Sequence, residues 1–294
     1  MTGGASRETW SFDAVHPDGE REGLILRRDR AGGLGATAET ERRLLEVAGN
    51  GGVAVPRVVR PLDDGYVMER VDGETIPRKI LRDDAFATAR PALARQVGEI
   101  AARIHALPLD AVPSLPGFDG FEHPALAQVH QYRAVLDAFG EPHPVFELGL
   151  RWIERHVPPV TGTALVHGDF RNGNFVVGPE GVRAVLDWEL AHLGDPMEDL
   201  GWLCVRSWRF RQVDKPVGGF GEYADLFAGY EAVSGKAVDP EVVRYWEVFG
   251  TLKWGEMCIV QAFTHLNGLH RSVELAAIGR RVCEMEWHLL EMIG

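Results

Sequence analysis

Cysteines and long apolar runs are scarce in this sequence. The three cysteines, Cys204, Cys258 and Cys283, lie far apart and show no spacing typical of a metal site. Their odd number favours a reducing compartment over a disulfide framework. No apolar run reaches the length that a transmembrane helix needs, and the N-terminal MTGGASRETW lacks the basic-then-apolar layout of a signal peptide. These absences predict a cytoplasmic protein without a membrane partner.

Basic residues are fewer than acidic ones. The 31 Lys and Arg against 43 Asp and Glu give a formal net charge of −12. Because nucleic-acid-binding proteins normally carry a basic face, we expect no nucleic-acid partner. A cationic substrate is compatible with this charge, although net charge does not locate the charge on the surface. The 294 residues, 45% hydrophobic and 25% charged, suffice for one large globular domain or two lobes.

A group of polar residues with informative spacing lies in residues 165–199. Asp169 follows His167 in the run HGD, Asn174 comes five positions after Asp169, and Asp187 thirteen positions after Asn174. A carboxylate such as Asp169 can accept a proton from a hydroxyl. Asn174 and Asp187 offer the hard oxygen ligands that suit Mg²⁺ bound together with nucleotide phosphates. A base followed by two metal ligands at these spacings is the set that kinases use for phosphoryl transfer.

The segment around this group is predicted to form a β-hairpin. Two runs rich in β-branched residues, 174–177 and 182–186, flank the turn sequence GPEG at 178–181. Such a hairpin would bring Asn174 and Asp187 beside each other. The oxygen ligands of a metal–nucleotide site would then converge from two loops.

These motifs resemble those of a known family. HGDFRNGN followed by LDWELAHLGDPMEDL is similar to the aminoglycoside phosphotransferase family, a branch of the protein-kinase-like fold. Within it, the second motif resembles the subgroup found with acyl-CoA dehydrogenases, whose substrates are not aminoglycosides. The resemblance covers nearly the whole chain and implies an α+β, two-lobe fold with ATP and Mg²⁺ as cofactors. It implies Asp169 as the catalytic aspartate, Asn174 and Asp187 as Mg²⁺ ligands, and His167 as a brace of the catalytic loop.

The resemblance also implies nucleotide contacts near the N-terminus. The segment GGASRET at 3–9 looks like the family's phosphate-covering loop, in which Gly4 and Ser6 would approach phosphate oxygens. Arg27, in a strand predicted at 23–29, stands where the family has a lysine that reaches the phosphates. Arginine keeps the charge but is not equivalent to lysine. Glu41, in a predicted helix, would pair with Arg27.

Two further strands, at 57–60 and 66–71, are predicted around the turn DDG. By resemblance, the second leads into the hinge between the lobes. Backbone groups of Glu69 and Val71 would bind adenine there, and Met68 would lie at the back of the adenine pocket. The expected organisation is an N-terminal nucleotide-binding lobe at 1–70 and a C-terminal catalytic and substrate-binding lobe at 71–294, with the hinge at 71–76.

From residue 83 onward apolar residues recur with helical spacing, which predicts a mainly helical lobe. Helices are expected at 37–48 in the first lobe, and at 91–107, 126–139, 145–156, 198–208, 223–233, 241–265 and 272–293 in the second.

Three functions remain open at this point. The leading hypothesis is an ATP-dependent transfer of the γ-phosphate to a hydroxyl of a small molecule, with Asp169 as base. A nucleotide-binding pseudokinase or regulatory module is an alternative that Arg27 keeps open. A metal-dependent hydrolase is another, and it leaves the segment 3–9 unexplained. The hydrolase would use His167, Asp169, Asp187, His192 and Asp195.

A strip that mixes cations with aromatic residues follows the motif segment 165–199. It comprises Arg206, Arg209 and Arg211 around Trp208 and Phe210, with Lys215 soon after. Such a strip would repel a polycation, so it predicts a neutral or anionic hydroxylated acceptor and weak activity on aminoglycosides.

Overall fold

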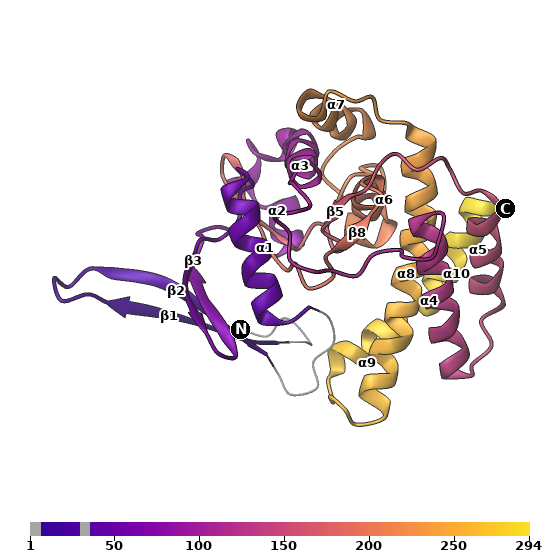
Figure 1. Ribbon diagram of the computed structural model, residues 1–294, viewed down its shortest axis with the longest axis horizontal. Coiled ribbons are helices and arrows are strands. Elements are labelled where there is room, and N and C mark those ends of the chain that lie inside the picture. The colour runs from indigo at the N-terminus through magenta and orange to yellow at the C-terminus, as the bar shows by residue number, and fades with distance from the viewer. Residues whose placement is uncertain (1–6, 30–35) are drawn as a thin grey trace.

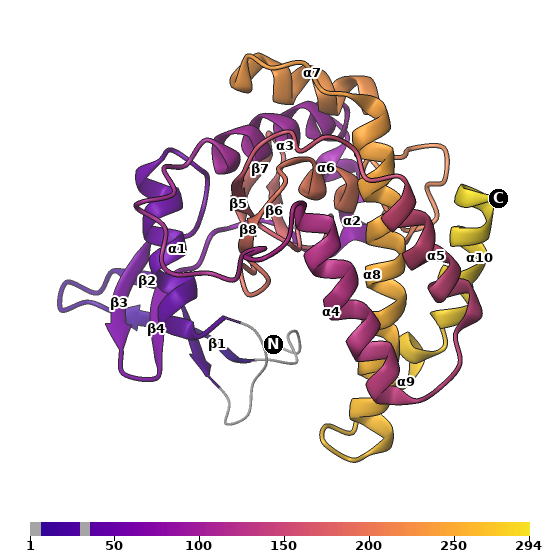
Figure 2. The same cartoon turned by 45° about the vertical axis from the view of Figure 1, so that its right-hand side comes forward.

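The computed structural model describes residues 7–29 and 36–294. A small β-sheet with one helix lies beside a larger, mainly helical part (Figures 1 and 2). Apolar side chains from both parts share one core that extends from Ile25 in the sheet to Leu289 near the C-terminus. None of the helices in the described part of the chain combines the length and the hydropathy that a membrane span requires.

The small part is a four-stranded antiparallel sheet in the order β1-β2-β4-β3. Its strands are β1 (Arg7–Val15), β2 (Arg21–Asp29), β3 (Val58–Leu62) and β4 (Gly65–Glu69). Helix α1 (Ala38–Asn50) is capped by Thr37, whose side chain accepts from the amide of Thr40. It buries Leu44, Leu45 and Ala48 on its apolar face.

The large part surrounds two short β-ribbons. Strand β5 (Ala164–Val166) pairs with β8 (His192–Gly194), and β6 (Phe175–Gly178) pairs with β7 (Gly181–Val185). The surrounding helices are α2 (Pro77–Arg82), η1 (Asp84–Phe86), α3 (Arg90–His105), α4 (Pro124–Phe139), α5 (Pro144–Arg155), α6 (Met197–Cys204), η2 (Arg206–Arg209), α7 (Tyr223–Ser234), α8 (Pro240–Leu266), α9 (Val273–Gly279) and α10 (Val282–Ile293).

Backbone hydrogen bonds join the segment after β4 to the β6–β7 hairpin. Glu74 and Val177 exchange both amide–carbonyl bonds at 2.9 Å. Gly73, with φ of 152°, lies so close to this strand that a Cβ would come within 2.6 Å of the Val176 side chain. The amide of Val185 also donates to the carbonyl of Ala54 at 2.8 Å. The β6–β7 hairpin is therefore hydrogen-bonded to the segment just before β3 and to the segment just after β4.

The structure corrects two of the expected elements and adds two that were not expected. The predicted helix at 198–208 ends at Cys204, because Val205 adopts an extended ψ of 133° before η2 begins. The predicted helix at 272–293 is two helices, since the chain turns at 280–281 between α9 and α10. Gly279 packs there against α8, where a Cβ would come within 2.5 Å of the Cβ of Ala262. Strand β8 and helix α2 were not expected.

Candidate active site

A cavity of about 570 Å³ opens between the sheet and the β6–β7 hairpin. Its lining includes apolar side chains, Ile25 and Met68 from the sheet and Leu186 from beyond β7. The lining also includes Arg27, Glu69, Val71, Arg171, Asn174 and Asp187. A cavity lined by both apolar and cationic side chains fits a nucleotide, whose base is flat and apolar and whose phosphates are anionic.

Asp169 is buried at 8% exposure and accepts three side-chain hydrogen bonds. Its Oδ1 accepts from Arg171 Nε and from Trp202 Nε1, both at 2.9 Å. Its Oδ2 accepts from Asn174 Nδ2 at 2.6 Å. The expected base therefore lies directly against the first expected metal ligand. Arg171 and Trp202 were not predicted.

The β6–β7 hairpin brings Asn174 and Asp187 together, as predicted from the sequence. The amide of Leu186 donates to the carbonyl of Asn174 at 2.8 Å, which places Asp187 next to it. Asn174 turns its amide nitrogen toward Asp169 and leaves its side-chain oxygen for a cation. With the Asp187 carboxylate beside it, this donor set fits Mg²⁺.

Asp187 is held in a costly backbone conformation. Its φ of 69° lies in the left-handed region, which residues other than glycine rarely adopt. Burial opposes ionisation of its carboxyl, but the charge and hydrogen bond of Arg27 outweigh burial and lower the pKa of Asp187 below its usual value. The carboxylate is therefore ionised at neutral pH.

His167 connects the loop that carries the expected base Asp169 (the catalytic loop) to the residues just before the expected metal ligand Asp187. Its Nδ1 accepts from the amide of Asp169 at 3.2 Å, so its proton lies on Nε2, which donates to the carbonyl of Leu186 at 3.1 Å. Burial lowers the pKa of His167 despite the neighbouring carboxylate of Asp199, so the ring is neutral. Both ring nitrogens form hydrogen bonds with backbone groups, so His167 stabilises the conformation of the loop, as the resemblance implied.

Asp199 holds the same loop from the other side. Its carboxylate accepts from the amides of His167 and Gly168 at 2.8 and 2.9 Å, and from His105 Nε2 at 3.0 Å. Gly168 adopts a φ of 79°, and a Cβ there would come within 2.2 Å of the carbonyl oxygen of Leu190. The glycine of HGD is therefore required by both conformation and space.

Arg27 and Glu41 come together as expected, and Asp187 joins them. Arg27 Nη2 lies 3.0 Å from Asp187 Oδ1, and its Nε lies 3.4 Å from Glu41 Oε2. Burial alone would lower the pKa of Arg27, but the two carboxylates raise it above its usual value. The arginine at the lysine position thus keeps its charge and contacts both lobes.

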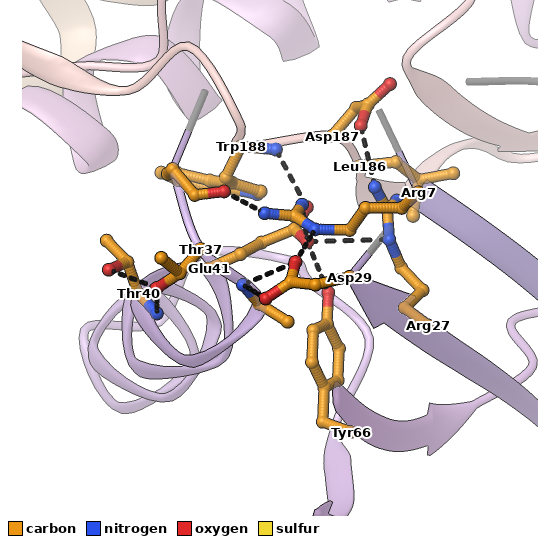
Figure 3. Close-up of polar contacts among 12 residues, drawn as sticks. Arg7, Arg27, Asp29, Thr37, Thr40, Glu41, Tyr66, Leu186, Asp187 and Trp188 are labelled. Atoms are coloured by element: carbon orange, nitrogen blue, oxygen red, sulfur yellow. Dashed lines mark hydrogen bonds and ion pairs between the residues drawn. The ribbon is translucent and has the colours of Figure 1, made fainter. Parts of the chain in front are cut away.

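Glu41 has further partners that the sequence did not indicate (Figure 3). It accepts from the hydroxyl of Tyr66 at 2.8 Å and from the amide of Trp188 at 3.2 Å. Arg7, buried at 3% exposure, forms an ion pair with it. Arg7 also pairs with Asp29 at 3.0 Å. Two arginines therefore balance Glu41, and one of them comes from the segment that had been assigned to phosphate.

The expected hinge residues Met68, Glu69 and Val71 line the cavity. Met68 is buried at 6% exposure. The amide of Glu69 already donates to the carbonyl of Arg57 at 3.0 Å, whereas no hydrogen bond within the described residues engages the amide of Val71. Gly4 and Ser6 lie outside the described residues, so their expected phosphate contacts stay predictions.

The residues of the hydrolase hypothesis do not form one metal site. His192 Nε2 lies 3.0 Å from Glu198, and Asp195 accepts from the hydroxyl of Thr161 at 2.6 Å. Across residues 7–29 and 36–294, no group of three or more His, Cys, Asp or Glu is arranged to hold a metal ion. A zinc-type centre is therefore not supported.

The basic strip is not an open cationic surface. Arg206 pairs with Glu291 at 2.8 Å, Arg209 with Glu247 at 2.7 Å, and Lys215 with Glu222 at 2.8 Å. Three of its four cations are thus matched by carboxylates, which removes the strip as an argument about the acceptor.

Lys253 is a buried cation that sequence reasoning missed. Its Nζ donates to the carbonyl of Gly168 at 2.8 Å and lies 3.3 Å from Glu198. It also lies 4.7 Å from the ring centre of Trp202. Helix α8 therefore supports the catalytic loop through a residue 85 positions away.

Comparisons with known proteins show the family of this chain. A family model described as the phosphotransferase enzyme family matches residues 3–235. The Mus musculus protein acyl-CoA dehydrogenase family member 10 is 34% identical over 202 residues, which cover 62% of this chain and 18% of the mouse protein. The chain thus matches less than a fifth of that relative's length.

Solved structures share the fold. A Ralstonia eutropha JMP134 protein assigned to the aminoglycoside phosphotransferases has a TM-score of 0.77 at 22% identity, covering 100% of this chain and 93% of that chain. The streptomycin–ATP–APH(2″)-IIa ternary complex has a TM-score of 0.61 at 16% identity, covering 100% of this chain and 92% of that chain. These likenesses confirm the expected kinase-like fold with its small sheet lobe and larger helical lobe.

Proposed function

The chain belongs to the phosphotransferase enzyme family, as its motifs predicted, and we propose that it transfers the γ-phosphate of ATP to a hydroxyl of a small molecule. One observation carries this proposal. Asp169 contacts Asn174 at 2.6 Å, and Asn174 lies beside Asp187 in the lining of a nucleotide-sized cavity. A base next to two oxygen ligands is what in-line phosphoryl transfer requires.

In this proposal, the lobe at 1–70 and the hinge at 71–76 bind the nucleotide. Adenine lies between Ile25 and Leu186 with Met68 behind it, and the backbone at Glu69 and Val71 provides its hydrogen bonds. The free amide of Val71 supports this placement. The phosphates lie toward Arg27, which Glu41 keeps in position, and the loop with Gly4 and Ser6 covers them.

Asp169 accepts the proton of the acceptor hydroxyl. Its short contact with Asn174 and its bond to Arg171 hold the carboxylate fixed before the acceptor arrives, so little reorganisation is needed in the transition state. Asn174 and Asp187 would hold Mg²⁺, which supplies charge neutralisation on the phosphate oxygens. His167 keeps the catalytic loop at a fixed distance from the residues just before Asp187.

The pseudokinase alternative is less well supported. It would require the loss of a catalytic group, yet Asp169, Asn174 and Asp187 are all present and adjacent. Arg27, the one departure from the usual lysine, pairs with Glu41 at 3.4 Å. A cation on the β2 strand is therefore still paired with a helix glutamate, as the phosphate-binding role requires.

The acceptor is proposed to be a small hydroxylated molecule, and the protein is expected to act in the cytoplasm. Acceptor pockets are built from helices and loops that vary within one fold.

A screen of hydroxylated compounds for ADP release tests the function. The parent should release ADP faster with at least one compound than with water alone, and Asp169→Asn should lose this gain by about 10²- to 10⁴-fold, the usual contribution of a general base. Asp169→Asn should still bind Mg-ATP. Asp110→Asn, the same substitution at an exposed site, should behave as the parent. Equal rates in parent and Asp169→Asn would contradict the proposal.

A further inference from the structure

The two oxygens of Asp169 are not equivalent. Oδ1 accepts two hydrogen bonds, from Arg171 Nε and Trp202 Nε1. Oδ2 accepts one side-chain hydrogen bond, from Asn174 Nδ2. A carboxylate oxygen has two lone-pair directions, so those of Oδ1 are filled and one of Oδ2 is left. The proton of an acceptor hydroxyl therefore has one well-defined place to go.

Trp202 is buried between an aromatic ring and a cation. Its side chain is 1% exposed on helix α6. The ring of Trp208 lies 5.2 Å away, and Lys253 Nζ lies 4.7 Å from its ring centre. Lys253 also donates to the carbonyl of Gly168, the residue before Asp169. The indole and the catalytic loop are thus attached to the same buried cation.

The hydrogen bond of Trp202 distinguishes it from its aromatic neighbours. Trp208 and Trp254 pack in the same cluster, and their indole nitrogens are buried without a hydrogen-bond partner among the described residues. Packing of this cluster therefore does not depend on indole N–H donors. Among these three tryptophans, and within the described residues, Trp202 alone directs its donor at a side chain, the proposed base Asp169.

We infer that Trp202 is a positioning residue that fixes the Asp169 carboxylate so that Oδ2 receives the hydroxyl proton. The inference rests on the proposed function. The step balances: the hydroxyl O–H bond breaks as the oxygen–phosphorus bond forms, the proton goes to Oδ2, and ADP leaves with the electron pair of the broken phosphorus–oxygen bond. Without the indole donor, the carboxylate can rotate and present either oxygen at varying angles.

The kinetic test compares two tryptophan variants with the parent protein. It measures ADP release from Mg-ATP, with water as the phosphate acceptor. Trp202→Phe should lower kcat for ADP release by about 10- to 100-fold, the scale of one hydrogen bond to a charged group, and leave the KM for Mg-ATP within about twofold. Trp254→Phe, in the same cluster but without a hydrogen bond, should match the parent. Added to Asp169→Asn, Trp202→Phe should have almost no further effect, because the two residues act as a unit.

A second measurement does not need turnover. In ¹⁵N-indole-labelled protein, the Trp202 N–H resonance is assigned by its absence in Trp202→Phe. It should shift in Asp169→Asn, where the charged acceptor is lost, and the Trp254 resonance should not. A shift confined to the Trp202 resonance indicates a lost contact, whereas misfolding of the variant would also shift the Trp254 resonance.

The outcomes are distinct. An unshifted Trp202 resonance in Asp169→Asn, or a Trp202→Phe enzyme with parental kcat, overturns the inference and leaves the proposed function standing. An additive double variant also overturns it. A parent whose ADP release does not depend on Asp169 overturns the proposed function itself, and the part assigned to Trp202 falls with it.

Discussion

Arg27 donates from Nη2 to Oδ1 of Asp187 at 3.0 Å, and this ion pair connects the sheet lobe to the end of the β6–β7 hairpin. The same guanidinium lies 3.4 Å from Glu41. The proposed phosphate cation and the proposed metal ligand are thus in direct contact. Because the proposed Mg²⁺ would share the Asp187 carboxylate with Arg27, nucleotide binding should depend on both residues at once.

Asp187→Ala should remove Mg²⁺-dependent nucleotide binding. The variant loses the charged member of the proposed metal pair and leaves Arg27 with one carboxylate partner. Calorimetric titration of Mg-ATP, repeated with ATP in a chelator, measures the metal-dependent part of the affinity. Asp64→Ala is the control, since Asp64 forms an exposed pair with Arg28, the residue next to Arg27. An unchanged Mg-ATP affinity in Asp187→Ala would take Asp187 out of the metal site.

Arg27→Lys and Arg27→Ala should differ. Lysine retains the charge but offers no fork to contact Glu41 and Asp187 together, so we expect activity within about tenfold of the parent. Alanine leaves both carboxylates without this cation, and kcat/KM for ATP should fall by about 100-fold or more, as expected when a charged partner of a buried site is lost. Arg28→Ala serves as the exposed control. If Arg27→Ala turns over ATP normally, the phosphate cation lies elsewhere in the chain.

Glu256 should make stability fall as pH rises. Both of its carboxyl oxygens are buried without a partner in the described part of the chain, and burial raises its pKa from 4.5 to about 9. The unfolded chain releases this proton above 4.5, whereas the folded chain keeps it until about 9. The folded state therefore loses stability between these two values, by roughly 3 kcal/mol from pH 5 to pH 7.

Urea unfolding of Glu256→Gln at several pH values checks this effect. The amide does not ionise, so the stability of the variant relative to the parent should increase from pH 5 to pH 9. The comparison at pH 5 is the internal control, because folded parent and variant are both neutral there. A difference in unfolding free energy that stays constant with pH would show that Glu256 ionises in the fold.

Much of the site could be predicted because its spacing is local. Asp169, Asn174 and Asp187 lie on one loop and one hairpin, so a turn signal at 178–181 was enough to bring them together. The pairing of Arg27 with Glu41 followed from the family resemblance. These predictions depended on residues close in sequence or on a motif that fixes their roles.

The missed features depend on contacts between distant segments. Trp202 lies 33 positions after its partner Asp169, and Lys253 lies 85 positions after its partner Gly168. No periodicity in the sequence indicates such contacts. Strand β8 has only three residues and exists because β5 pairs with it. The break at 280–281 interrupts a segment whose apolar spacing continues, because the packing of Gly279 on α8 sets the direction of the chain.

The charge of the acceptor can be predicted from the residues around the base. An aminoglycoside carries several positive charges and needs unpaired carboxylates. Here Asp169 already pairs with Arg171, and Glu198 contacts both Lys253 and His192.

One turn from Lys253, Glu256 is neutral at pH 7 because burial raises its pKa to about 9. We therefore expect kanamycin-type compounds to be poor acceptors, and neutral or anionic hydroxylated compounds of similar size to be better ones in the same ADP-release assay. A specificity constant for an aminoglycoside of about 10⁴ M⁻¹s⁻¹ or more, the range of native substrates, would show that carboxylates near Asp169 become available when the acceptor binds.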